Sequence, residues 1–175
     1  YDQIPFVYEV VEAFNLPIFT EQGFEADDVI GTLVTKLKKQ KTNDGITSII
    51  VTGDKDLLQL VDDKKTEVYL LKKGLSEFEL YDDEKVREVF GFGPEQMVDY
   101  KALRGDTSDN IPGVKGIGEK TAKDLIQNFE SLDGIYKALK KEDSKIKPAV
   151  AKKLKDDEKN ARMSQELSAI STDIQ

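Results

Sequence analysis

The stretch RGDTSDNIPGVKGIGEKTA, residues 104–122, places two opposed chemistries in a single loop. Asp106 and Asp109 open it, and a glycine-rich basic segment follows: Gly113, Lys115, Gly116, Gly118 and Lys120. Carboxylates repel a phosphate group, whereas lysines and the backbone N–H groups of glycine turns attract one. A divalent cation would reconcile the two, because a bound metal inverts the charge of an acidic cluster.

Apolar residues recur at helical spacing on both sides of this loop. They predict helices over 82–91, 94–105, 119–129, 131–141, 147–157 and up to about residue 170. Nearer the N-terminus, the patterns predict helices at 6–14, 25–40 and 56–61, and strands at 46–52, 66–71 and 76–81. The run ITSIIVT indicates a strand buried on both faces, Ile18 and Phe19 a further short buried strand, and KTNDG, residues 41–45, a turn.

This order of elements predicts an α/β chain with two parts. Residues 1–91 form a mostly parallel sheet with flanking helices, and residues 92–175 form an all-helical region. A chain of 175 residues is long enough for one well-buried core with a smaller helical lobe attached.

Composition excludes several kinds of site. The chain has no histidine and no cysteine, so Ser-His-Asp catalysis, Cys-His catalysis and thiolate zinc sites are excluded. Oxygen ligands remain, and these favour Mg²⁺, Mn²⁺ or Ca²⁺. The net charge of −8 argues against a simple electrostatic clamp on nucleic acid, and no apolar run is long enough to span a bilayer.

Three acidic groups lie where the chain turns or a helix begins. They are Glu25, Asp27 and Asp28; Asp54 and Asp56; and Asp106 and Asp109. Each group alone is also typical of ordinary structure, since acids complement a helix N-terminus and aspartate favours turns. If the fold brings them together, their repulsion requires cations. Two divalent ions about 4 Å apart are a recurring arrangement for phosphodiester hydrolysis.

The glycine–lysine turn favours contact with a nucleic-acid backbone. Gly113, Gly116 and Gly118 allow close approach of an anion, with Lys115, Lys120 and Lys123 beside them. The spacing differs from dinucleotide and P-loop motifs and fits a helical hairpin that grips duplex DNA without sequence preference. A plain turn between two helices is the alternative, as a solvated face is for the lysines between 137 and 155.

Three segments together resemble a known family. GFEADDVIGTL (23–33), VTGDKDLLQLV (51–61) and ALRGDTSDNIPGVKGIGEKTA (102–122) are similar to the 5′-nucleases, which include flap endonucleases and the 5′→3′ exonuclease domains of bacterial DNA polymerase I. The resemblance implies part of a 5′-nuclease, or PIN-like, core followed by a helix–three-turn–helix DNA-binding region. It also implies a phosphodiesterase, dependent on Mg²⁺ or Mn²⁺ at two or more sites, that cuts 5′ flaps and 5′ ends in DNA replication and repair.

The resemblance assigns roles to particular residues. The metal ligands, direct or through water, would be Glu25, Asp27, Asp28, Asp54, Asp56, Asp106 and Asp109, with Asp54 and Asp106 catalytic. The turn would hold the duplex backbone through Gly113, Lys115, Gly116, Gly118, Lys120 and Lys123, with a K⁺ ion bound in it. The implied partner is DNA with a 5′ flap, nick or 5′ end.

The resemblance also implies a setting for the chain. It predicts a monomer fused to a polymerase domain, located in the bacterial cytoplasm and associated with the nucleoid. Family members begin with a strand that carries a metal-binding aspartate and with an arch that handles the 5′ strand, and neither matches this sequence. We therefore expect the 175-residue chain alone to have little or no nuclease activity.

Two other functions are compatible with the residues. In one, the helical hairpin is a non-catalytic DNA-binding module and the acids are helix caps and turns. In the other, the chain belongs to a metal nuclease that acts on RNA, although a grip on duplex backbone is not needed there. Loss of Mn²⁺ binding in Asp54→Asn and Asp106→Asn variants would distinguish a nuclease from the binding module.

Overall fold

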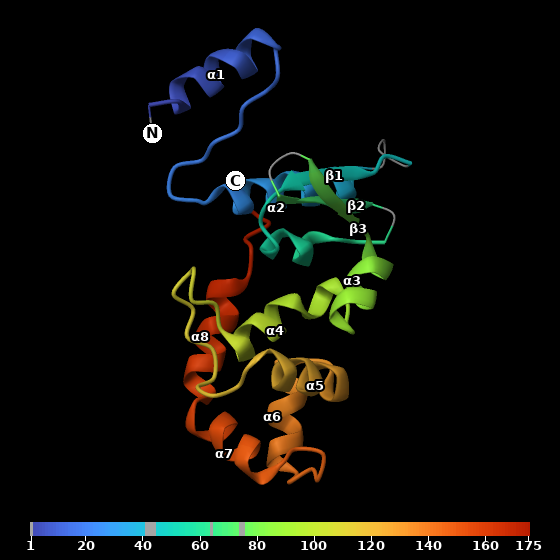
Figure 1. Cartoon of the computed structure of the whole chain (residues 1–175), viewed down its shortest axis with the longest axis vertical. Coiled ribbons are helices and arrows are strands. Elements are labelled where there is room, and N and C mark those ends of the chain that lie inside the picture. The colour runs from blue at the N-terminus through green and yellow to red at the C-terminus, as the bar shows by residue number, and fades with distance from the viewer. Residues whose placement is uncertain (1, 41–44, 64, 74–75) are drawn as a thin grey trace.

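The computed structural model describes residues 2–40, 45–63, 65–73 and 76–175 (Figure 1). The turn predicted at 41–45 lies outside these ranges except for Gly45. The chain forms an α/β part and a helical part, which lie end to end along the long axis in Figure 1. Within the described residues, no helix is long and apolar enough to cross a membrane.

A small mixed sheet forms the centre of the α/β part. Its strands are β1 (Ser48–Thr52), β2 (Thr66–Lys73) and β3 (Glu77–Tyr81), in the order β1-β2-β3. β1 pairs with β2 in parallel, with Ile50 opposite Val68. β2 pairs with β3 antiparallel. Three further elements complete this part: α2 (Ala26–Lys39), the 3₁₀ helix η2 (Asp56–Leu60) and α3 (Asp83–Phe90). The predicted α/β class is confirmed, but the sheet is mixed and not mostly parallel, because β3 follows β2 after a short connection and pairs with it antiparallel.

One face of the sheet carries the first hydrophobic core. Ile50, Val68 and Leu70 are buried there, together with Val34 from α2 and Leu58 from η2. On β1, the residues between them, Ile49 and Val51, are 57% and 64% exposed. The prediction that this strand is buried on both faces is therefore wrong. An unbroken apolar run does not indicate whether one face or both will be covered by other elements.

The first segment of the chain lies apart from both cores. α1 (Ile4–Ala13) has no buried residue, and Figure 1 shows it standing off the body of the molecule. The strand predicted at Ile18 and Phe19 is wrong, because both residues are exposed and lie in irregular backbone between α1 and α2. No strand among the described residues pairs with this segment.

The helical part is built around α4 (Met97–Arg104), which follows the short 3₁₀ helix η3 (Pro94–Gln96). α5 (Glu119–Phe129), α6 (Leu132–Lys140) and α8 (Glu158–Ser168) pack against it, and α7 (Pro148–Asp156) leads into α8. The second core fills the space between them, with Leu103, Ile126, Ile135 and Leu154 fully buried. Phe90 and Met97 contact both cores, so the two parts pack directly against each other.

The C-terminal residues 169–175 return from the helical part to the α/β part along α2. The backbone N–H of Ser171 donates to Asp28 Oδ1 at 2.8 Å, and that of Ile174 donates to Thr32 Oγ1 at 3.2 Å. Lys36 Nζ donates to the Ile174 carbonyl at 2.9 Å. We call residues 169–175 the tail strap, because it ties the last helix to the α/β part.

Candidate metal centre and helix-hairpin turn

Three carboxylates converge where the α/β part meets the helical part. Asp56 begins η2, which follows β1 after a short turn, and Asp106 and Asp109 lie in the loop that follows α4. Each offers a carboxylate oxygen, and these oxygens all lie within 4.8 Å of one another. The fold thus joins the second and third acidic groups of the sequence, which are about fifty residues apart in the chain.

The loop after α4 fixes Asp106 through its own backbone. The Asp106 N–H donates to the Ile111 carbonyl at 2.9 Å, and the Ile111 N–H donates back at 2.7 Å. Asp106 Oδ1 accepts from the backbone N–H of Ser108 at 2.9 Å and from its hydroxyl at 2.5 Å. These bonds from Ser108, assisted by Lys101, lower the pKa of Asp106 to about 2. Asp106 is therefore a fixed anion at neutral pH.

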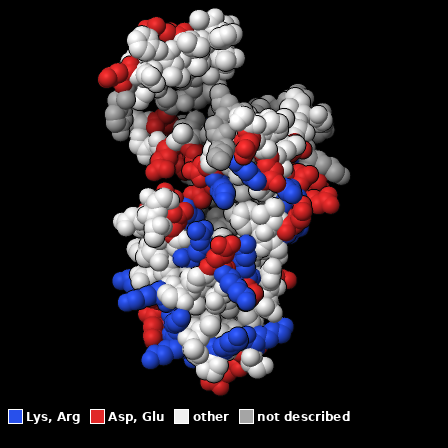
Figure 2. Space-filling view, in the orientation of Figure 1, with Lys and Arg blue, Asp and Glu red and all other residues white. Residues whose placement is uncertain are grey.

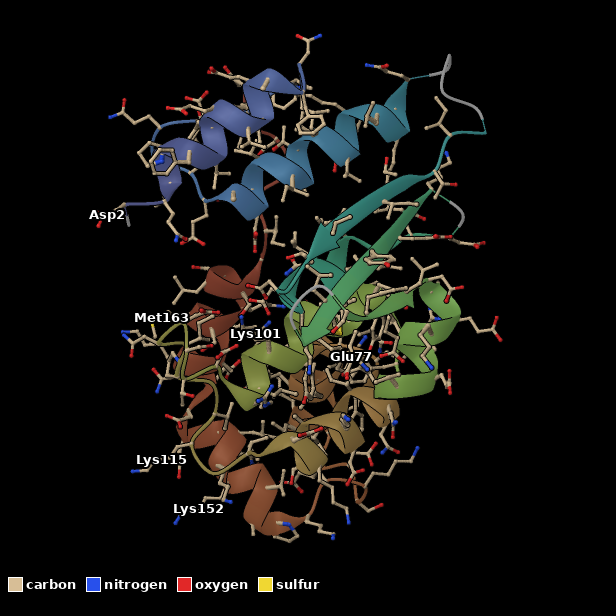
Figure 3. All side chains as sticks on the ribbon, turned by 45° about the horizontal axis from the view of Figure 1, so that its top comes forward. Asp2, Glu77, Lys101, Lys115, Lys152 and Met163 are labelled. Atoms are coloured by element: carbon tan, nitrogen blue, oxygen red, sulfur yellow. The ribbon has the colours of Figure 1, made fainter. Side chains whose placement is uncertain are left out.

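Lys101, which the sequence reasoning missed, lies among these three acids. Its Nζ is 2.7 Å from Asp109 Oδ2 and 3.2 Å from Asp106 Oδ2, and it also pairs with Asp56. Burial acts to lower the pKa of Lys101, but hydrogen bonds from Nζ to Asp109 and Asp56 outweigh it and raise the pKa. Figure 3 shows Lys101 on α4 near the middle of the molecule.

The acids at the start of α2 line a cavity together with two of these three carboxylates. One cavity, of about 520 Å³, is lined by Glu25, Asp27, Asp28, Asp56 and Asp109, with Lys101 and Glu166. The adjoining cavity, of about 440 Å³, is lined by Asp54, Asp56, Asp106 and Lys101 among others. All seven predicted acids therefore line one or other of two cavities that share Asp56 and Lys101. Glu166, on α8, is an eighth acid that sequence reasoning missed.

Burial and neighbouring negative charge raise the pKa of two of these carboxyl groups. Burial, followed by the charges of Asp54 and Asp56, raises the pKa of Asp27. Burial also raises the pKa of Asp56, against the opposing effect of Lys101. Carboxylates that disfavour one another's ionisation are stabilised as anions by an added cation. The donor set, oxygens only and rich in carboxylates, fits a hard divalent cation such as Mg²⁺ or Mn²⁺.

Asp28 is held differently from the other acids. Its Oδ2 accepts from the Glu25 N–H at 3.2 Å, which caps α2, and its Oδ1 accepts from Ser171 of the tail strap. Asp54 Oδ1 accepts from the Asp56 N–H at 2.9 Å, and this bond stabilises the turn that positions Asp56. Both acids hold backbone in place as well as contributing charge to the cavities.

The glycine–lysine turn joins α4 to α5 through the loop 105–118. Gly113 has a φ of 61°, and its N–H donates to the buried Ser164 Oγ at 3.0 Å. The Lys115 N–H donates to Asp157 Oδ2 at 2.7 Å, and Lys153 Nζ donates to the Gly116 carbonyl at 2.7 Å. The junction of α7 and α8 therefore holds the turn from one side.

The lysines predicted to bind DNA point in different directions. Figure 3 shows Lys115 extending outward, as does Lys152 farther down the same side. Lys120 is exposed at the start of α5, whereas Lys123 pairs with Glu119 at 2.9 Å and lies 5.5 Å from the Phe90 ring. Figure 2 shows basic side chains spread over the helical part, while acidic ones gather higher up.

Comparison with known proteins identifies related chains. A family model described as "5'-3' exonuclease, N-terminal resolvase-like domain" matches residues 1–91, and one described as "5'-3' exonuclease, C-terminal SAM fold" matches residues 92–175. DNA polymerase I of Caldicellulosiruptor bescii is 45% identical over 98% of this chain, and that of Bacillus subtilis is 41% identical over 98%. The chain spans 19% of the length of each of these relatives.

Solved structures share the fold. The bacteriophage T5 D15 protein, co-crystallised with metal ions, superposes with a TM-score of 0.77 at 23% identity, covering 98% of this chain and 59% of that one. The catalytic core of Rad2, in complex with DNA substrate, gives a TM-score of 0.62 at 22% identity, covering 98% of this chain and 57% of that one. With both family models matched in sequence order, the chain belongs to the 5′-3′ exonuclease family.

Proposed function

We propose that the chain is the metal-dependent 5′→3′ exonuclease or 5′-flap endonuclease portion of a DNA polymerase I-like protein. The observation that carries this proposal is the gathering of acids from three separate sequence segments around two adjoining cavities. The family match and the DNA polymerase I relatives support it. The reaction is hydrolysis of DNA phosphodiesters by a two-metal mechanism, in replication and repair.

In this proposal the acids divide between two ion sites. Asp56, Asp106 and Asp109, whose carboxylate oxygens lie within 4.8 Å of one another, would hold one ion. Glu25 and Asp27 line a cavity with Asp56 and would contribute ligands to the other, next to Asp54, whose charge acts on Asp27, while Asp28 fixes the start of α2. A divalent cation bound by these carboxylates supplies Lewis acidity toward phosphate oxygens. Asp54 and Asp106, both held by turn hydrogen bonds, keep the ligand oxygens aimed at the cavities. Mg²⁺ or Mn²⁺ suits this donor set.

We further propose that the helical part, residues 92–175, binds the duplex next to the cleavage site. Gly116 and Gly118 are exposed, and Lys115 and Lys120 add positive charge, whereas Gly113 is buried and shapes the turn through its N–H bond to Ser164. A K⁺ ion in this turn would add to that charge. Solved relatives described as a T5 flap endonuclease complex with DNA and metal ions, and as Rad2 with DNA substrate, support DNA with a 5′ flap, nick or 5′ end as the partner.

Binding of Mn²⁺ to the 175-residue chain tests the proposal without requiring turnover. Isothermal titration should show binding to the wild type, and weakening of about tenfold or more in Asp54→Asn and Asp106→Asn. Asp63→Asn, which removes an exposed acid outside both cavities, should bind like the wild type. Absence of binding, or equal binding in all four chains, would refute the metal centre.

A non-catalytic DNA-binding module is the second candidate. It is favoured by one observation: Lys101 already pairs with Asp56, Asp106 and Asp109, so these acids have a partner without a metal. In that case the chain should bind duplex DNA equally well with Mn²⁺ and with EDTA. The aspartate variants should then bind DNA no worse than the wild type.

A further inference from the structure

The Lys101 ammonium sits at the centre of the acids that would bind one of the metals. Asp56, Asp106 and Asp109 come from two separate segments, and Nζ pairs with all three. An ammonium has three N–H donors, so each acid can accept one of them. The lysine side chain is only 10% exposed. It thus gives three carboxylates a cationic partner at the position where they converge.

The backbone of Lys101 is held in place, because α4 packs into the second core. Tyr100, Ala102 and Leu103, the residues around Lys101 in the helix, are buried in the second core. The Lys101 stem is therefore fixed at its base, and its ammonium reaches toward the loop that follows the same helix. Among the described residues, no other lysine or arginine forms an ion pair with these three acids.

Lys101 and a divalent cation require the same oxygens. The three carboxylate oxygens lie within 4.8 Å of one another, a spacing that suits a single ion. An ammonium that remained among them would face a doubly charged ion at short range, which is strongly repulsive. Lys101 lines both cavities, so its four-carbon stem can carry Nζ toward either one without moving α4.

We propose that Lys101 is an internal counter-ion that competes with the divalent cation for Asp56, Asp106 and Asp109. The inference rests on the proposed metal-dependent function and adds a property to that site. Without metal, Lys101 holds the η2 acid and the loop acids together. When metal binds, the ammonium leaves the cluster, and the work of displacing it lowers the apparent affinity.

Competition and a supporting role predict opposite effects on metal affinity when Lys101 is removed. If Lys101 only oriented the ligands, its removal would loosen the cluster and weaken metal binding. If it competes, a neutral residue leaves the three acids mutually repelling, so the metal-free chain becomes less stable while its affinity for metal rises. The two effects are measured independently, in EDTA and in a titration.

The test compares Lys101→Met and Lys101→Gln with the wild type. Both substitutions remove the charge and shorten the side chain by only one heavy atom, and glutamine avoids an added apolar group beside the carboxylates. Lys38→Met is the matched control, since Lys38 is also partly buried, pairs with Asp62 and lines neither cavity. Melting temperatures are measured in EDTA and with Mn²⁺, and Mn²⁺ affinity by calorimetry.

We expect both Lys101 variants to melt at lower temperature than the wild type in EDTA, to bind Mn²⁺ on the order of tenfold more tightly, and to gain more stability from it. Lys38→Met should leave the Mn²⁺ affinity unchanged. Equal or weaker Mn²⁺ binding by both Lys101 variants, with binding intact in the wild type, overturns the competition. No Mn²⁺ binding by any chain overturns the metal centre and this inference with it.

Discussion

At the scale of single residues, Gly113 shows how closely the turn is built onto α4. Its φ of 61° is a conformation that residues with a side chain rarely adopt. An added Cβ would lie 2.3 Å from the Gly105 backbone nitrogen. Gly118, in contrast, has a φ of −95° and no atom within 4 Å of such a Cβ.

We therefore expect Gly113→Ala to lower the free energy of unfolding by about 2 kcal/mol or more, and Gly118→Ala to change it little. Urea unfolding of the two variants measures the difference. In a duplex-binding assay, Gly118→Ala should still weaken binding, because its methyl group occupies open space next to the turn. Equal stability of the two variants would contradict the strained geometry at residue 113.

Tyr136 gives a prediction for alkaline pH. Its hydroxyl donates to the Leu154 carbonyl at 3.0 Å, and burial, reinforced by the charge of Glu158, raises its pKa to about 12. The phenol of an unfolded chain titrates near 10. The folded state thus favours the protonated form, a stabilisation complete below about pH 10 and lost as the pH rises to about 12.

Tyr136→Phe should be less stable than the wild type by about 1 kcal/mol at pH 8, since the hydrogen bond is lost. Between pH 9 and 12 it should lose less stability than the wild type, by about 2 kcal/mol. Denaturant unfolding across this pH range provides the measurement. Parallel curves for the two chains would show that the pKa of Tyr136 is not raised in the folded state.

The acidic residues of the site were predictable from sequence, but Lys101 was not. Asp54 and Asp106 stand next to strand and turn signals, so their chemistry can be inferred from local context. Lys101 lies in an ordinary helical pattern, and lysines on helices usually face solvent. One signal existed: its neighbours in the predicted helix, Tyr100, Ala102 and Leu103, are apolar. Its ion pairs, however, depend on where η2 packs, which is a tertiary property.

At the scale of elements, the α7–α8 junction determines the position of the turn. Asp157 accepts from the Lys115 N–H and also from the Asn160 amide at 2.9 Å. The boundaries of α7 were predictable from sequence. Pro148 is typical of the first position of a helix, and the lysines that follow it recur at helical spacing. The contact itself was not predictable, since 42 residues separate its partners.

Asp157→Ala provides a test in which charge and geometry act in opposite directions. Removing an acid near DNA should strengthen duplex binding by electrostatics alone. We expect weaker binding, by about threefold to tenfold, because the Lys115 backbone loses its anchor. Asp156→Ala removes the same charge from the neighbouring residue and should bind equally well or more tightly. A common increase in both variants would show that the turn does not need Asp157.

Strand β1 shows that a β-rich run predicts an extended backbone but not which faces of the strand are buried. ITSIIVT predicted the strand correctly, yet Ile49 and Val51 are exposed while Ile50 is buried. The alternation arises because α2 and η2 cover one face of the sheet. Local sequence specifies the extended backbone, whereas the covering of each face depends on distant elements.

At the scale of the whole molecule, the tail strap joins the two parts. Ile170 packs so tightly on α2 that a Cβ at Gly31 would lie 2.8 Å from its Cγ2. Gln59 of η2 adds two further bonds, donating to the Ser168 carbonyl at 3.0 Å and accepting from the Ile170 N–H at 3.0 Å. The strap therefore spans α2, η2 and α8.

Thr32→Val removes the acceptor for the Ile174 N–H with little change in volume. We expect a loss of about 1 kcal/mol in unfolding free energy and faster amide exchange in α2 and the strap, with α5 and α6 unaffected. Thr35→Val, on the same helix, should preserve the slow exchange. Hydrogen–deuterium exchange followed by peptide provides the measurement, and unchanged protection of α2 in Thr32→Val would show that the strap does not hold it.

The strap also bears on how the chain is made. Asp28 meets its partner Ser171 only after 143 further positions have been synthesised. While the ribosome adds the helical region, the face of α2 that carries Gly31 and Thr32 has no cover. Folding of the first half is thus completed only by the last residues of the second, which predicts that the nascent α/β part stays sensitive to protease until the whole segment has left the exit tunnel.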